Sequence, residues 1–260
     1  MKTIALVNQK GGCGKTTAAV NLAGALAARG HRVCLVDLDP QAHATLALSV
    51  AVERGELSIA DVLLHGASLR DSLRGAPGGI VLVPATLELG ELEESAARTL
   101  HPERLLGLAL SEIADDFDFA LLDCPPRADG VLTANALRAS DVAVLVVETS
   151  AFALQGAVKA LDLFAEMAAD ASFEVRVLGT LFDRRTDLAR ELLIGTQARF
   201  AHRMFDTVIH QSARLREAAA SGVPVQVLDP ACRAARDFEA LAEEVCALQP
   251  EPRAVLAGAR

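Results

Sequence analysis

Residues 9–17 read QKGGCGKTT, and this loop is the stretch of the sequence best suited to chemistry. A glycine-rich loop ending in Lys-Thr is typical of a phosphate-binding loop, whose backbone N–H groups surround the phosphates of a nucleotide. Lys15 would place its charge on the β- and γ-phosphates, and the Thr16 hydroxyl would ligate Mg²⁺. The residues expected to contact the nucleotide in this loop are Lys10, Gly11, Gly12, Cys13, Gly14, Lys15, Thr16 and Thr17.

The loop departs from the strict pattern G-x-x-x-x-G-K-[ST] at its first position, where Gln9 replaces glycine. The three glycines at 11, 12 and 14 and the lysine–threonine pair are enough to surround a phosphate, so the missing glycine does not argue against a nucleotide site. The more unusual feature is Lys10, a second cation inside the loop.

Aspartates that follow two apolar runs supply the second part of the predicted site. Asp123 follows residues 119–122, where a carboxylate that holds a water on Mg²⁺ is expected. Asp37 and Asp39 follow residues 32–36, where two carboxylates could contact metal-bound waters or orient an attacking water. We assign Asp39 as the water-orienting residue and a ligand of Mg²⁺ through water, with Asp37 as its support. Either residue alone would also fit a turn or a helix cap.

Alternating apolar and helical segments must position these groups. The runs predicted as strands are residues 3–8, 32–36, 80–83, 119–122, 142–147 and 175–181, and the predicted helices are residues 15–28, 102–114, 132–139, 152–168 and 188–202. Strands that are apolar on both faces indicate a doubly wound, mostly parallel α/β sheet covered by helices on both sides. The chemically loaded segments at 9–17, 37–40, 121–126 and 181–187 would then meet at the carboxyl edge of the sheet. We expect a single domain over residues 1–260, with a surface turn at residues 75–79.

The composition limits the class of protein. The 260 residues are 52% hydrophobic, which suffices for a sizeable core, and the absence of Trp and Tyr disfavours a stacking platform for single-stranded nucleic acid. A net charge of −9 argues against a wholly basic nucleic-acid surface but allows a local basic patch. Neither an 18-residue apolar run nor a membrane-anchoring tail at residues 251–260 is expected. The cysteines, which lack C-x-x-C spacing and are expected to be reduced and buried, are Cys13, Cys34, Cys124, Cys232 and Cys246.

The sequence resembles the deviant-Walker ATPases of the partitioning type, the ParA/Soj group within the family that also includes MinD. The motifs that carry the resemblance are KGGCGKTT at 10–17, DLDPQ at 37–41, LLDCPP at 121–126 and RLREA at 214–218. The resemblance extends from residue 2 to about residue 245. It implies a Mg²⁺-dependent ATP hydrolase with a P-loop fold that positions a chromosome, a plasmid or another large cargo in the bacterial cytoplasm.

The resemblance also implies partners. In the family, the lysine at the position of Lys10 reaches the phosphates of a partner subunit in a homodimer that sandwiches ATP, where it would stabilise charge as an arginine finger does. The ATP dimer would bind DNA non-specifically over the nucleoid, through basic residues at the positions of Arg185 and Arg214. The arginines that could extend this patch, each of which also fits a solvated surface, are Arg184, Arg199, Arg203 and Arg216. A ParB-like protein with a basic N-terminal segment would stimulate hydrolysis.

Two segments depart from the family pattern. His210 and Ser212 replace the proline and asparagine that help to hold adenine in the family, so these two residues are the expected adenine contacts. Serine is short and offers one donor, which makes a weaker or water-bridged contact to adenine the expectation. Residues 148–152 (ETSAF) replace the usual pattern near the dimer face, which affects partner preference more than ATP use.

Three other functions fit parts of the sequence. A MinD-like membrane-associated regulator would need a C-terminal amphipathic helix, which residues 251–260 do not supply. An iron–sulfur carrier would need cysteines on a shared face, and Cys124, beside Asp123, is expected to pack near the nucleotide instead. A metabolic ATP-dependent ligase or kinase of the same fold would need a substrate pocket, and Lys10 is not specific to such an enzyme.

Overall fold

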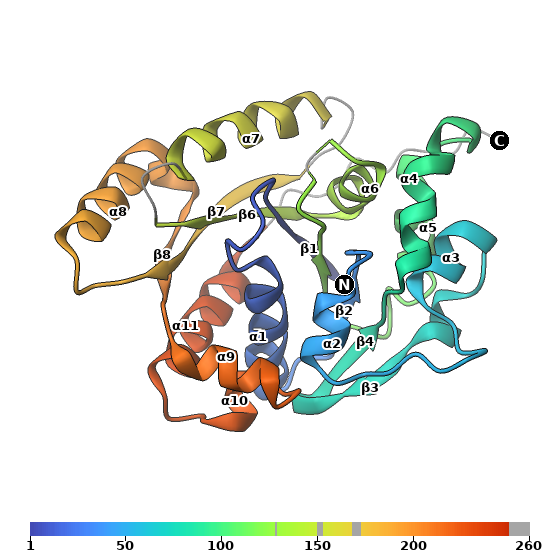
Figure 1. Ribbon diagram of the computed structural model, residues 1–260, viewed down its shortest axis with the longest axis horizontal. Coiled ribbons are helices and arrows are strands. Elements are labelled where there is room, and N and C mark those ends of the chain that lie inside the picture. The colour runs from blue at the N-terminus through green and yellow to red at the C-terminus, as the bar shows by residue number, and fades with distance from the viewer. Residues whose placement is uncertain (128, 150–152, 168–172, 250–260) are drawn as a thin grey trace.

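One twisted sheet forms the centre of the molecule (Figure 1). The computed structural model describes residues 1–127, 129–149, 153–167 and 173–249. Within this part the strand order is β3-β4-β2-β5-β1-β6-β7-β8. The strands are β1 (Lys2–Val7), β2 (Val33–Asp37), β3 (Arg74–Ala76), β4 (Ile80–Val83), β5 (Phe119–Asp123), β6 (Val142–Glu148), β7 (Glu174–Phe182) and β8 (Met204–His210). Because β1 leads to β2 on one side, while β6, β7 and β8 extend the sheet on the other, the carboxyl end of β1 is the expected ligand crevice.

The helices cover both faces of this sheet (Figure 1). They are α1 (Lys15–Ala28), α2 (His43–Ala47), α3 (Ile59–His65), α4 (Glu91–Ser95), α5 (Leu105–Ser111), α6 (Val131–Ala139), α7 (Ala153–Met167), α8 (Asp187–Phe200), α9 (Ala213–Ala220), α10 (Val225–Leu228) and α11 (Arg233–Ala247). The core on one face is built with α1, α9 and α11, and the core on the other face with α3, α5, α6 and α7.

Strand β1 shows why helices cover both faces of the sheet. Its side chains alternate, so Ile4 and Leu6 enter the core beside α1 while Ala5 and Val7 enter the opposite core. All four residues are at most 1% exposed. A strand buried on both faces must be apolar throughout, which is why the run could be read directly from the sequence.

Pairing along the sheet is parallel except between β3 and β4, which form an antiparallel edge hairpin. The turn predicted at residues 75–79 is present there, as a 3₁₀ turn over Pro77–Gly79. Asp123 is in register with Leu6 of β1 and with Asp37 of β2. The carboxyl ends of these three central strands are therefore level, and the polar segments that follow them meet as expected.

Each predicted strand is present within one residue of its expected bounds. The helix expected at residues 102–114 is shorter, because a 3₁₀ turn (Pro102–Arg104) precedes α5, and the last residues of the helix expected at 188–202 also form a 3₁₀ turn. The ends of the helix predicted at 152–168 lie outside the described residues. The elements not predicted are β3, β8, α2, α3, α4, α9, α10 and α11, most of which are short or half exposed.

Carboxylates of α11 accept hydrogen bonds from backbone N–H groups along the exposed edge of β8. The backbone N–H groups of Asp206 and Thr207 each donate to the Glu244 carboxylate at 2.8 Å. The N–H of His210 donates to Asp237 at 3.0 Å. Charged acceptors satisfy the outward N–H groups that would otherwise be open to pairing with another strand.

We expect Glu244→Ala to lower the free energy of unfolding by about 1–2 kcal/mol, because two charge-assisted hydrogen bonds are lost from a half-buried edge. Glu244→Gln, which keeps one acceptor oxygen, should lose about half as much. Glu243→Ala is the matched control on the same helix, since Glu243 makes an exposed ion pair with Arg29 and should change stability by less than about 0.5 kcal/mol. Urea unfolding measures all three, and equal effects of Glu244→Ala and Glu243→Ala would show that the edge does not depend on Glu244.

Candidate functional site

The loop between β1 and α1 has the backbone of a phosphate-binding loop. Gly12 and Gly14 adopt positive φ angles of 77° and 90°, which side chains on L-residues rarely allow. The Thr180 hydroxyl of β7 donates to the Cys13 carbonyl at 2.7 Å and so fixes the loop to the neighbouring part of the sheet. The loop ends at the first turn of α1, whose N–H groups could bind an anion.

The two lysines of the loop are held by different partners. Lys15 is 7% exposed, and its ammonium donates to the carbonyl of Lys10 at 3.3 Å. Lys10 instead forms an ion pair with Glu148, at the end of β6, over 2.8 Å between Nζ and Oε2. The Lys10 side chain is 50% exposed, so its amine lies at the surface of the carboxyl edge. The sequence pointed to segment 148–152 but did not pair Glu148 with Lys10, and residues 150–152 lie outside the described residues.

Asp37 and Asp39 lie at the carboxyl end of β2 as expected. Asp37 is fully buried and accepts hydrogen bonds from the backbone N–H and hydroxyl of Thr45, at 2.8 and 2.7 Å, and from the N–H of Asp39 at 3.2 Å. Burial raises the pKa of Asp37 to about 6, although these hydrogen bonds oppose the rise. Asp39 accepts from the Gln41 N–H at 2.9 Å, and its other oxygen lies 3.9 Å from Nδ1 of His43. Sequence reasoning missed Thr45, since nothing local marks a threonine as the partner of a carboxylate eight residues earlier.

Asp123 ends β5 and is fully buried. Among the described residues, no group reaches either carboxylate oxygen in hydrogen-bonding geometry. Burial, and next the charge of Asp37, raise its pKa well above the usual range, while the nearby Thr16 hydroxyl and Lys15 ammonium oppose that rise. A buried carboxylate without a partner is costly and calls for a cation or a bound water as its counterpart.

This donor set fits Mg²⁺. The Thr16 hydroxyl and the carboxylates of Asp39 and Asp123 are oxygen ligands, which Mg²⁺ prefers either directly or through its waters. The unpartnered oxygens of Asp123 are where a metal-bound water would be accepted. By contrast, the described residues hold no group of three or more His, Cys, Asp or Glu side chains of the kind that binds a metal through protein ligands alone. Cys124 is buried with its thiol turned to the Leu122 carbonyl, and burial raises its pKa well above the usual range.

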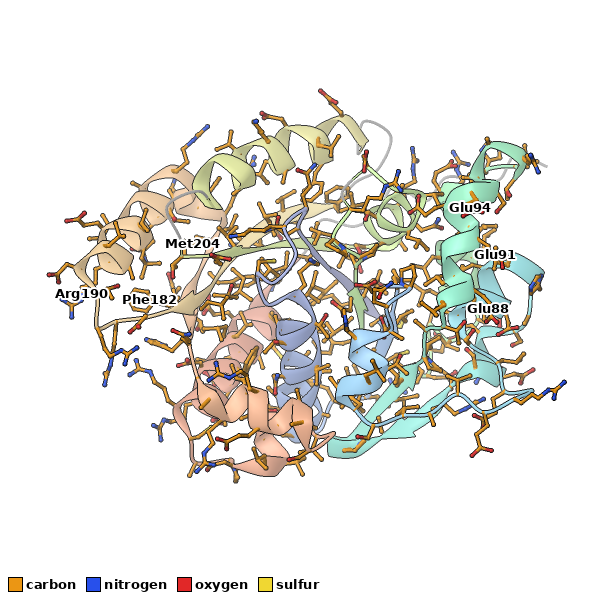
Figure 2. The ribbon with its side chains drawn as sticks, viewed as in Figure 1. Glu88, Glu91, Glu94, Phe182, Arg190 and Met204 are labelled. Atoms are coloured by element: carbon orange, nitrogen blue, oxygen red, sulfur yellow. The ribbon has the colours of Figure 1, made fainter. Side chains whose placement is uncertain are left out.

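A cavity of about 420 Å³ opens at the carboxyl ends of β7 and β8. It contains both expected adenine contacts, and its lining residues are Phe182, Asp183, Arg184, Arg185, His210, Gln211, Ser212, Ala213, Arg216 and Arg233. A volume of this size is in the range of small-molecule sites. Figure 2 shows Phe182 on the side of the molecule away from Glu88, Glu91 and Glu94.

The ring of His210 is already engaged within the protein. Its Nδ1 lies 2.9 Å from the Asp237 carboxylate, its Nε2 lies 2.9 Å from a guanidinium nitrogen of Arg233, and its edge meets Phe182. Arginine can only donate, so Nε2 accepts and Nδ1–H donates to Asp237, which assigns the neutral ring. Ser212 precedes α9 and makes no capping bond to that helix. Of the two predicted adenine contacts, Ser212 offers its hydroxyl, whereas His210 offers only the face and edge of its ring.

The arginines predicted to contact DNA are exposed but paired. Arg185 forms a short ion pair with Asp183 at 2.6 Å, and Arg214 pairs with Glu217 at 2.6 Å and with Asp229 at 3.2 Å.

The other candidate arginines divide into two groups. Arg184 and Arg216 line the same cavity as Arg185. Arg199 and Arg203 line a different cavity of about 430 Å³ at the far end of α8. A 14-residue helix is about 20 Å long, so Arg199 and Arg203 do not extend the patch around Arg185.

No helix in the described part of the chain is both long enough and apolar enough to cross a membrane.

Comparison with known proteins agrees with this architecture. Residues 1–175 match the family model described as an AAA domain. The sporulation initiation inhibitor protein Soj of Bacillus subtilis is 36% identical over 250 residues, which cover 95% of this chain and 98% of that protein. The chromosome-partitioning ATPase Soj of Thermus thermophilus is 39% identical over 252 residues, covering 95% and 96%.

Among solved structures, cobyrinic acid a,c-diamide synthase of Mycobacterium smegmatis with a bound ATP analogue and magnesium is similar, with a TM-score of 0.78 and 28% identity over 95% of this chain and 94% of that chain. The full-length match to both Soj proteins, together with the phosphate loop and its carboxylates, identifies the family. The chain belongs to the ParA/Soj group of P-loop ATPases, which hydrolyse ATP with Mg²⁺.

Proposed function

We propose that this protein is a partitioning switch: a single ATPase domain that dimerises around ATP, binds DNA non-specifically over the bacterial nucleoid and is reset when a ParB-like partner stimulates hydrolysis. The observation that carries the proposal is the position of Lys10. Its amine is half exposed at the carboxyl edge of the sheet, and its partner there is Glu148 rather than the phosphate-facing part of the loop. A lysine that serves only its own nucleotide has no need to face outward.

Two such edges facing each other would bring two triphosphates and their carboxylates together. Lys10 from each subunit would then offset charge on the partner's phosphates, as an arginine finger does. The triphosphate state would hold the dimer, and the diphosphate state would release it, because loss of the γ-phosphate removes the group that Lys10 contacts. A dimer that forms with the triphosphate and dissociates with the diphosphate would act as a switch timed by hydrolysis.

Within each subunit the residues have separate roles. Lys15 would move from the Lys10 carbonyl to the β- and γ-phosphates, and the Thr16 hydroxyl would ligate Mg²⁺. Asp123 and Asp39 would hold waters of that ion, which when bound neutralises charge on the phosphates. Asp39 would also orient the attacking water, with Asp37 and Thr45 fixing the backbone beside it.

The DNA-binding part of the proposal is supported by the distribution of charge. Arg185 and Arg214 have side chains that are 80% and 53% exposed. Glu88, Glu91 and Glu94 lie on the side of the molecule away from Phe182, which lines the same cavity as Arg185 (Figure 2). An acidic protein can therefore present a basic face to phosphates, and dimerisation would double it.

A second candidate is an ATP-dependent enzyme that acts on a small carboxylate. It is favoured by the similarity to cobyrinic acid a,c-diamide synthase, at 28% identity. The two candidates differ in one measurable property, since only the partitioning switch requires DNA binding that depends on the triphosphate.

The deciding experiment uses Asp39→Ala, which should bind ATP and dimerise yet hydrolyse it slowly. This variant should bind double-stranded DNA with ATP but not with ADP, and the affinity should fall at least about tenfold between 50 and 200 mM salt because several phosphate contacts are made. Arg214→Gln should weaken this binding, whereas Arg236→Gln, an exposed arginine on α11, is the matched control. Equal DNA binding in both nucleotide states would overturn the partitioning function, and a normal hydrolysis rate would overturn the role of Asp39.

Glu148→Gln should strengthen the ATP-dependent dimer about two- to fivefold, because it releases Lys10 from a partly exposed ion pair. Analytical ultracentrifugation with ATP measures the dimer constant. In a Lys10→Ala background, which should lose most of the dimer, Glu148→Gln should have no further effect. A weaker dimer in Glu148→Gln alone would mean that the ion pair supports the assembled state instead of competing with it.

The buried carboxylates predict a pH dependence for the nucleotide-free protein. The folded-state pKa of Asp37 is about 6, against 3.8 for the unfolded chain, so the folded state binds more protons between these values. The free energy of unfolding should therefore fall as the pH rises from about 4 to about 6, by about 1–3 kcal/mol from this group. Asp118 and Asp183, whose pKa values are lowered to about 2 by their arginine partners, contribute in the opposite direction only below this window.

Urea unfolding at pH 4.5 and 7, without nucleotide or Mg²⁺, tests this expectation. In Asp123→Asn the fall should be smaller, because a second buried carboxyl, whose own pKa is raised well above the usual range, is removed, and the variant should be more stable than the wild type at pH 7. An identical pH dependence in the two proteins would contradict the raised pKa of Asp123.

A further inference from the structure

The cavity at the ends of β7 and β8 is strongly cationic. Four of its lining side chains are arginines and one is an aspartate, while the ring of His210 is neutral. The chain as a whole carries a charge of −9. Arg185 is the expected DNA contact and Arg184 and Arg216 could extend that patch, so a base in this cavity would lie beside the same positive charge.

The four arginines are not equivalent. Arg185 is held by Asp183 through its backbone N–H, Nε and a terminal nitrogen. Arg233 is held by Nε2 of His210. The side chains of Arg184 and Arg216 make no ion pair or hydrogen bond to another residue in the described part of the chain. These two guanidiniums are the ones available to a ligand.

Guanidinium groups that are free to donate determine which edge of a base this cavity can recognise. Arginine offers only donors, in a planar fork that suits two neighbouring acceptors. Guanine presents such a pair, N7 and O6, and arginine on this edge is the commonest specific contact to guanine in protein–DNA complexes. Adenine carries an amino group at the position where guanine has O6. An arginine N–H at that position would therefore meet another donor instead of an acceptor.

The acceptors that an adenine amino group would need are scarce in this cavity. Both oxygens of Asp183 are engaged by Arg185, and Nε2 of His210 by Arg233. The Ser212 hydroxyl and the Gln211 amide remain, each of which can also donate. The wall formed by Phe182 and His210 is aromatic and could pack against the face of any purine.

We infer that this cavity accepts guanine as well as adenine, so that the protein binds and hydrolyses GTP in addition to ATP, with Arg184 and Arg216 donating to O6 and N7. This inference rests on the proposed function and on the assignment of His210 and Ser212 as base contacts, which places the base in this cavity. The hydrolytic step is the same for both nucleotides. Water forms a bond to the γ-phosphorus, the bond between that phosphorus and the β–γ bridging oxygen breaks, and GDP, inorganic phosphate and a proton are released.

Displacement of a fluorescent ATP analogue from the full chain with Mg²⁺ tests the inference. GTP should compete within about tenfold of ATP. ITP, which keeps O6 and N7 but lacks the amino group of guanine, should match GTP, and 7-deaza-GTP, which lacks N7, should bind about tenfold more weakly than GTP. CTP, which lacks a purine face, should compete least.

Arg184→Gln and Arg216→Gln should each raise the ratio of GTP to ATP dissociation constants by about tenfold, equivalent to about 1.4 kcal/mol. Arg236→Gln, on α11 and outside the cavity, should leave that ratio unchanged. Phosphate release from GTP should show the same order among the variants.

The possible results distinguish failure of the guanine inference from failure of the proposed function. ATP binding without competition by a hundredfold excess of GTP would overturn the guanine inference and leave the proposed ATPase switch standing. GTP binding that is insensitive to 7-deaza substitution and to both arginine variants would also overturn it, since the affinity would then come from the phosphates alone. Failure of ATP itself to bind would overturn the proposed function.

Discussion

The nucleotide site depends on holding three carboxylates together at the carboxyl ends of β2 and β5. Asp37 and Asp123 are in register on neighbouring strands and are both fully buried, so burial raises the pKa of each, and the charge of Asp37 raises that of Asp123 further. Lys15 is a nearby cation, but its ammonium is bonded to a loop carbonyl. The strands that carry these groups are buried on both faces and cannot move apart to relieve the repulsion. The folded protein therefore holds a preorganised cation site at a cost in stability, and ligands that bind only the folded state recover that cost.

The same carboxylates connect to the surface that faces other molecules. Thr45 bonds Asp37 through both its N–H and its hydroxyl, and the hydroxyl also accepts the N–H of Ala85 after β4. Thr45 is part of α2, whose far end packs so closely on the turn after α9 that a Cβ at Gly222 would lie 1.9 Å from the Ser49 hydroxyl oxygen. Helix α9 carries Arg214. Asp37 is therefore linked through Thr45 and α2 to the part of the chain that carries Arg214.

The elements that could be predicted from the sequence are those whose environment is uniform. Strands such as β1 and β5 are apolar on both sides, so their runs mark them within one residue. Strand β8 mixes buried Phe205 with exposed Asp206, and its edge is satisfied by Glu244, 38 residues later, which leaves no local signal.

The nucleotide site likewise has parts that could be predicted from the sequence and parts that could not. The phosphate loop and the three aspartates are contiguous motifs and could be named in advance. The pairing of Lys10 with Glu148 joins residues 138 positions apart in the chain, and the His210–Asp237 contact depends on the strand that was missed. Without β8 beside β7, the two residues assigned to adenine and Arg185, one of the two assigned to DNA, could not be seen to share a cavity.

The arginines that line this cavity differ in their roles. The pair between Arg185 and Asp183 is largely exposed, and exposed pairs contribute only about 0–1 kcal/mol, so Arg185 can exchange its carboxylate for a phosphate at little cost. Arg233 and Asp237 enclose a His210 side chain that is only 17% exposed, and losing one member would leave buried polar groups without partners. Arg233 therefore builds the wall, while Arg184, Arg185 and Arg216 line the cavity with exposed side chains. A base inside the cavity and a phosphate at its rim would draw on the same positive charge, so the proposed switch would couple nucleotide occupancy to DNA affinity at one place in the fold.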